Sequence, residues 1–133
     1  MPIEVSRLEQ GILPQRITGS FNATSMREAH DTGFEIMHAA GDTKIVLITE
    51  GIHAALPDVD VSIAAFRQLT KENTGFVLRS IVVVVSPALR IGLSGRGRIT
   101  GVPFLLVPDL NTALTHARRI LASAASPASD GDQ

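Results

Sequence analysis

Four arginines near the middle of the chain offer the clearest binding chemistry. They are Arg79, Arg90, Arg96 and Arg98. The stretch from Asn73 to Pro108 that contains them has no acidic residue. Glycines flank Arg96 and Arg98, so exposed backbone N–H groups and forked guanidinium groups could together hold a phosphate or a carboxylate. The segment lacks the lysine of a P-loop and the glycine spacing of a dinucleotide-binding loop. The pattern therefore favours either an anion-binding loop or a solvated glycine-rich turn.

A serine at a predicted helix start is the second candidate. Ser62 follows Asp58 and Asp60, and either Asp60 or Ser62 can cap the helix that begins there. A phosphate on Ser62 would meet the positive end of the helix dipole, but it would also meet both carboxylates. The residues themselves allow a phosphorylated switch as well as a plain helix cap.

The histidines give little support for metal or catalytic chemistry. The chain has four, at His30, His38, His53 and His116. None has a second ligand at the spacing of a metal site, so we expect them to be solvated or hydrogen-bonded. His53 follows an apolar strand, with Glu50 nearby, and that pair could do acid–base work. Neither a Gly-x-Ser-x-Gly elbow nor a His-Glu-x-x-His motif is present, so we expect no enzyme, no cofactor and no metal.

Composition excludes several further classes. The chain has no cysteine, which rules out disulfides, thiolate nucleophiles and cysteine-ligated metals. The net charge of −1 and the lack of Trp and Tyr argue against a nucleic-acid surface. No apolar run approaches the roughly 20 residues that cross a bilayer, and no signal peptide is evident. We therefore expect a cytoplasmic protein without a membrane span.

Apolar runs predict the strands that must position these residues. Ser80 to Ser86 holds five consecutive β-branched apolar residues, which predicts a central strand covered on both faces. Lys44–Thr49 and Pro103–Val107 are further apolar strands. Ile3–Leu8 and Ile12–Phe21 predict an N-terminal β-hairpin, with its turn at residues 9–11. Pro14 indicates an edge strand or a bulge in that hairpin.

Helical patterns alternate with these strands. Ser25 and Glu28 form a predicted capping box before an apolar stripe that Gly41 ends. A second helix follows Asp60 or Ser62, and a short one runs from residue 88 to about residue 93. Asp109 is expected to cap a final helix whose buried face has six apolar residues, Leu110, Ala113, Leu114, Ala117, Ile120 and Leu121.

The resulting order is β-β-α-β-α-β-α-β-α. It predicts one α/β domain over residues 1–122, with a mixed sheet of four to five strands. Residues 123–133 are rich in Ser, Ala and Asp and are expected to form a disordered tail.

This order resembles that of STAS-type domains, the superfamily of the SpoIIAA-like anti-sigma-factor antagonists and their Sec14-like relatives. The resemblance covers roughly Pro2 to Leu121. It rests on the element order, on the junction of the 44–49 strand with the 56–69 helix, and on the Asp109-Leu110-Asn111-Thr112-Ala113-Leu114 helix start. In antagonist members a partner kinase phosphorylates a serine in an Asp-Ser-Ser-Gly-Leu-like motif at the second helix. Asp60-Val61-Ser62-Ile63-Ala64 stands at that place, so the resemblance implies that role for Ser62.

Two functions follow as expectations. The first is a non-enzymatic, STAS-like regulatory module that docks a protein partner through the Asp58–Ser62 helix start. The second is a binder of a small anionic or lipid-like ligand through the Arg- and Gly-rich segment 90–101. An edge strand in the N-terminal hairpin could also pair in a homodimer. In each case the expected site lies along the carboxyl ends of the 44–49 and 80–86 strands.

Overall fold

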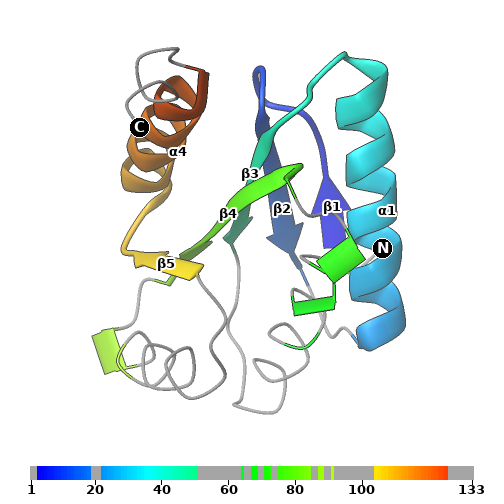
Figure 1. The fold of residues 1–133 in the computed structure, drawn as a ribbon. Coiled ribbons are helices and arrows are strands. Elements are labelled where there is room, and N and C mark those ends of the chain that lie inside the picture. Colours follow the sequence, from blue (N-terminus) through cyan, green and yellow to red (C-terminus); the bar gives the residue numbers. More distant parts are fainter. Residues whose placement is uncertain are drawn as a thin grey trace.

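The computed structural model describes a five-stranded mixed sheet. It covers residues 3–18, 22–50, 75–84 and 104–125, with the single positions 64, 67, 68, 71, 72, 87, 88 and 91. The strands are β1 (Ile3–Val5), β2 (Ile12–Ile17), β3 (Ile45–Glu50), β4 (Val77–Val83) and β5 (Phe104–Val107). They lie in that order across the sheet, with β1 antiparallel to β2 and the other neighbours parallel (Figure 1). The predicted α/β class with a mixed sheet is confirmed.

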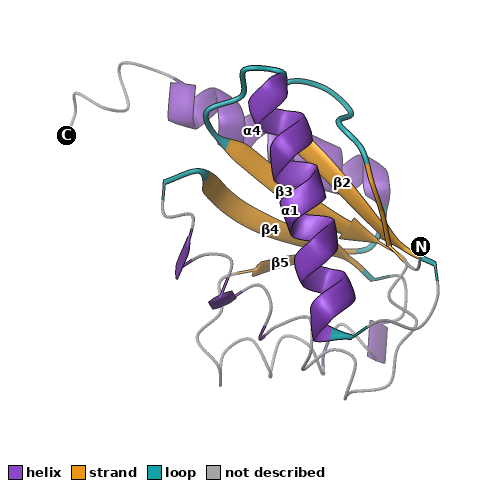
Figure 2. Cartoon of the chain, turned by 90° about the vertical axis from the view of Figure 1, so that its right-hand side faces the viewer, coloured by secondary structure: helices purple, strands orange, loops and turns teal. Residues whose placement is uncertain are grey.

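Two long helices cover opposite faces of this sheet. Figure 2 shows α1 (Ala23–Ala39) in front of the strands and α4 (Leu110–Ala125) behind them. Neither helix in the described part of the chain is long and apolar enough to cross a membrane. The helices predicted on either side of β4 fall largely outside the described residues. The single positions described there are 64, 67, 68, 71, 72, 87, 88 and 91, and each has helical backbone.

The apolar run in β4 lies at the centre of the fold, as predicted. Ile81 and Val83 belong to the core cluster on the α4 face, and Val84 belongs to the cluster on the α1 face. The strand begins at Val77, three residues before the predicted start. β3 also contributes to both clusters, because residues 45–49 are all buried and alternate between the two faces.

The N-terminal hairpin is confirmed, but Pro14 does not mark an edge strand. β2 lies between β1 and β3, and Pro14 stands in register with Ile48. The carbonyl of Pro14 accepts a hydrogen bond from the Ser6 N–H, which shows that its backbone polar groups point toward β1. These groups point away from β3, so the missing proline N–H removes no β2–β3 hydrogen bond. On the other side, β1 has already ended at this position. The edge strand of the hairpin is β1.

Helix α1 begins earlier than the predicted Ser25–Glu28 capping box. Its N-cap is Asn22, whose side chain accepts from the Ser25 N–H, while the Asn22 N–H donates to the Ser25 hydroxyl, both at 2.9 Å. Ser25 is therefore the third helical residue of the box rather than its cap. Asparagine and serine cap equally well, so propensity alone did not separate the two positions. The helix ends as predicted, with Gly41 in the left-handed region at φ +90°.

Helix α4 begins as predicted and extends further than expected. The Asp109 carboxylate accepts from the Thr112 N–H at 2.7 Å, which is the expected cap. Ala113 and Ala117 are fully buried, and the other four predicted residues pack partly buried against the same cluster. The helix runs to Ala125, so residues 123–125 of the predicted tail are helical. The rest of that tail lies outside the described residues.

Candidate functional site

The predicted site residues lie outside the described residues. They are Asp58, Asp60, Ser62, Arg90, Arg96 and Arg98, together with His53. The structure does describe the strands that lead to them. β3 ends at Glu50 and β4 ends at Val83, and these strands are parallel neighbours. The segment that carries Ser62 and the segment that begins before Arg90 therefore leave the sheet from the same edge, as expected from the sequence.

Three buried polar side chains lie on the α1 face of the sheet. Gln15 on β2 is in register with Thr49 on β3, and both are buried. Ser80 on β4 is buried too and is in register with Leu47, which belongs to the α1-face core. Gln15 Nε2 contacts the Met26 sulfur at 3.9 Å, but Gln15 Oε1 is buried with no hydrogen-bond partner among the described residues. An acceptor left unsatisfied in this way is costly.

His30 on α1 is a further buried polar side chain. It is 1% exposed and lies on the sheet-facing side of α1, between Met26 and Phe34. Burial lowers its pKa to about 4. Two smaller effects act in opposite directions, since Asp31 raises this pKa and Arg27 lowers it. The imidazole is therefore neutral at physiological pH. A neutral histidine can donate from one ring nitrogen and accept at the other, so it suits hydrogen bonding more than charge pairing.

Sequence reasoning missed the burial of Gln15, His30, Thr49 and Ser80. A signal for part of it was available. His30 lies four residues after Met26 and seven before Met37, which is the spacing of the buried stripe on α1. Gln15 and Thr49 gave no such signal, because their burial depends on the register of β2 against β3.

A groove of about 440 Å³ opens at the opposite, amino end of the parallel strands. Residues from the β1–β2 turn, the α1–β3 loop and the end of α4 line it, namely Gln10, Gly11, Gly41, Asp42, Thr43, Lys44, Leu121, Ala122 and Ala124. Its walls are close-packed at Gly11, where a Cβ would lie 2.8 Å from Leu121 Cδ2. The Lys44 side chain is the exposed cation among the lining residues.

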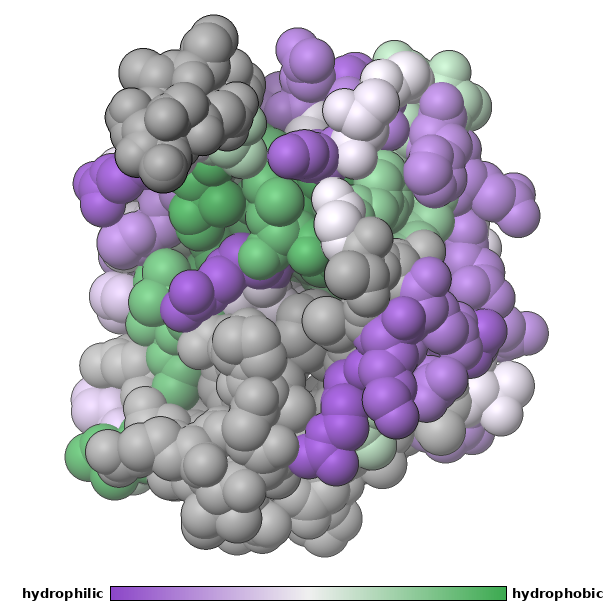
Figure 3. Space-filling view, viewed as in Figure 1, coloured by the Kyte–Doolittle hydropathy of each residue, from purple (hydrophilic) through white to green (hydrophobic). Residues whose placement is uncertain are grey.

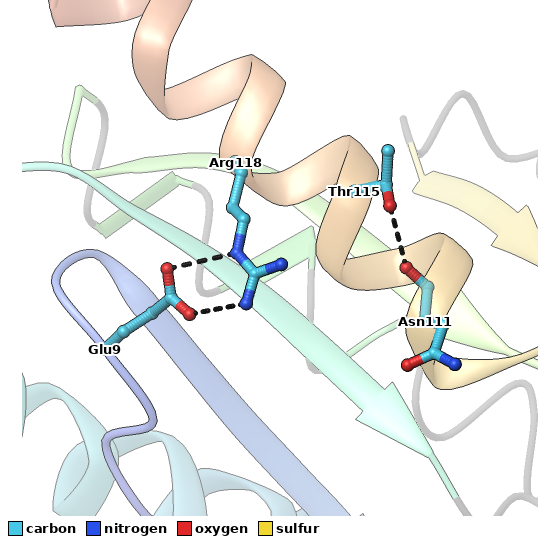
Figure 4. Close-up of polar contacts among 4 residues, drawn as sticks. All are labelled: Glu9, Asn111, Thr115 and Arg118. Carbon is cyan, nitrogen blue, oxygen red and sulfur yellow. Dashed lines mark hydrogen bonds and ion pairs between the residues drawn. The ribbon is translucent and has the colours of Figure 1, made fainter.

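Two bidentate ion pairs hold the elements around this groove together. Arg7 donates to both carboxylate oxygens of buried Asp42, at 2.9 and 3.2 Å, and these bonds lower the pKa of Asp42. Figure 4 shows Arg118 on α4 donating to both oxygens of Glu9 in the hairpin turn, at 3.2 and 2.8 Å. That pairing lowers the pKa of Glu9. Both carboxylates are therefore engaged in linking the hairpin to its neighbours.

Arg79 is the member of the acid-free stretch that the structure describes. It lies on β4 and is half-buried, and its Nε–H has no hydrogen-bond partner among the described residues. None of the ion pairs in the described part of the chain includes it. Sequence reasoning grouped Arg79 with the other arginines, but it did not predict that this cation would lack a carboxylate partner among the described residues.

The described residues offer no metal centre, because no group of three or more His, Asp or Glu side chains in them could hold a metal ion. Comparison with known proteins adds no assignment. The scan against protein-family models and the searches of curated proteins and of solved structures found no match to this chain. The resemblance to STAS-type domains therefore stays a prediction from the sequence.

Proposed function

We propose that the protein is a non-enzymatic, STAS-like regulatory module that docks a protein partner at the carboxyl edge of its sheet. One observation carries this proposal. β3 and β4 are adjacent parallel strands, so the segments that follow them begin side by side at that edge. The first of these segments contains Asp58, Asp60 and Ser62. A phosphate on Ser62 would add negative charge at this edge and so change which partner surface fits it.

Affinity capture with matched variants tests the docking role. Wild type, Ser62→Ala and Ser62→Glu serve as baits. Ser123→Glu serves as the control, because it introduces the same charge on the last turn of α4. The neighbouring residues Ala122 and Ala124 line the groove at the opposite, amino end of the parallel strands. We expect Ser62→Glu to lose or gain a partner relative to wild type. Ser123→Glu should capture the same partners as wild type. Identical partner sets for all four baits would remove Ser62 from the account.

A second function is favoured by Arg79, which has no carboxylate partner among the described residues. We propose, as the alternative, a binder of a small anionic or lipid-like ligand that uses the Arg- and Gly-rich segment 90–101. This segment lies between β4 and β5 in the sequence. Arg79, which precedes it on β4, pairs with no carboxylate in the described residues. A thermal-shift screen with phosphorylated metabolites and fatty acids tests it. A stabilisation that Arg96→Ala and Arg98→Ala abolish supports this function, and a flat response to every compound contradicts it.

A further inference from the structure

Arg79 differs from the arginines that the fold uses as structural links. Arg7 and Arg118 each direct two N–H groups at one carboxylate, at distances of 2.8 to 3.2 Å. Arg79 is half-buried, and its Nε–H is shielded from solvent and lacks an acceptor among the described residues. A guanidinium cannot lose its charge in a protein, so this group retains a donor that needs an oxygen.

The surroundings of Arg79 strengthen its attraction for an anion. Arg79 lies two residues before Ile81 and in register with Val46, and both of these belong to the apolar cluster on the α4 face. Its side chain therefore leaves the sheet on that face. Figure 3 shows apolar side chains gathered between α4 and the strands in this view. Apolar neighbours lower the local dielectric, which strengthens the interaction of a fixed cation with a bound anion.

β4, β5 and the residues between them offer Arg79 no acidic side chain as a partner. β5 begins beside the residue that follows Arg79, since Phe104 is in register with Ser80. Both strands, and all residues between them, belong to the stretch from Asn73 to Pro108 that contains no Asp or Glu. An acceptor for Arg79 from these elements would have to be a neutral group, and a bound oxyanion is the better match to a guanidinium.

We propose that Arg79 binds an oxyanion, the phosphate or carboxylate group of a small ligand, through the N–H groups of its guanidinium. Two parallel N–H donors on one side of the guanidinium match two oxygens of such a group. The inference rests on the second function proposed above and names its anchor residue.

The test uses the full chain with inorganic phosphate and succinate as probes, against sodium chloride at equal ionic strength. Thermal shift measures binding, and the ¹H–¹⁵N signals of the arginine Nε–H groups report which arginine is engaged. We expect phosphate or succinate to raise Tm and to move one Nε–H signal, which Arg79→Gln removes. Arg79→Gln should weaken binding about tenfold or more, the effect of losing a charged hydrogen-bonded pair.

Two further variants make the result decisive. Arg119→Gln removes an exposed cation from α4 and should leave the probe response as in wild type. Arg79→Lys keeps the charge but loses the fork, so it folds with the charge in place and should bind more weakly than wild type. A response unchanged in Arg79→Gln overturns the inference, as does the absence of any response to both probes. If Arg96→Ala and Arg98→Ala abolish a response that Arg79→Gln retains, the second function stands without Arg79.

Discussion

Lowering the pH from 8 to 5 is expected to weaken the fold through one side chain, His30. Burial lowers its pKa from 6.5 to about 4. Between these two values the unfolded chain binds a proton that the folded chain does not, so stability is full above the upper value and falls as the pH falls toward the lower one. The two pKa values make the free energy of unfolding about 2 kcal/mol lower at pH 5 than at pH 8 through this group.

Urea unfolding of wild type and His30→Gln at both pH values measures this effect. Circular dichroism follows the transition, because the chain has no Trp or Tyr for fluorescence. The variant lacks the titrating imidazole, so its stability should fall by about 2 kcal/mol less than that of wild type over this range. Met37→Ala is the control, since it weakens the same helix–sheet contact and should lower stability equally at both pH values. Equal pH dependence in wild type and His30→Gln would refute the reasoning.

Two further predictions concern the turn of the hairpin and the start of α1. Gly11→Ala should cost about 1–3 kcal/mol more than Gly41→Ala in urea unfolding, because both have positive φ but only at Gly11 does a Cβ collide, with Leu121 at 2.8 Å. An equal cost at the two glycines would show that the turn is not packed against α4. Asn22→Ala should lower the free energy of unfolding by about 1 kcal/mol because it removes the helix cap, while Glu28→Ala should be nearly neutral. A larger loss for Glu28→Ala than for Asn22→Ala would instead support the predicted Ser25–Glu28 capping box.

Local patterns were enough to place most of the sheet. The runs Ile45–Ile48 and Ile81–Val84 are apolar at every position, and such runs suit strands that are covered on both faces. The order of elements then limits the connections, since parallel neighbours need crossovers. The cap of α4 was also accessible, because Asp109 is followed directly by the periodic pattern of the helix.

Prediction failed where two local solutions were equally good or where burial came from distant residues. Asn22 and Ser25 are both strong caps, and only the helix start in the fold separates them. Pro14 was taken to indicate an edge strand or a bulge because proline lacks a donor. The fold tolerates it inside the sheet because its nitrogen points past the end of β1, which no pattern within β2 reveals.

The expected site illustrates the same division. Parallel neighbours β3 and β4 do bring two candidate segments to one edge, as the order of elements implied. The burial of Gln15 was not expected, because a glutamine becomes buried only when a helix and a neighbouring strand cover it. Asp42 likewise gains its partner Arg7 from 35 residues away in sequence.

By itself, the sequence determined the class of fold, the central place of the valine run and the chemistry that cysteine-free, aromatic-poor composition excludes. These follow from short-range periodicity and composition, which every window of the chain carries. Only the tertiary structure decided which polar groups are desolvated and which charges are paired. It left Arg79 without an acceptor in the described residues and His30 in the core, because desolvation and pairing depend on what the other strands and helices bring to each side chain.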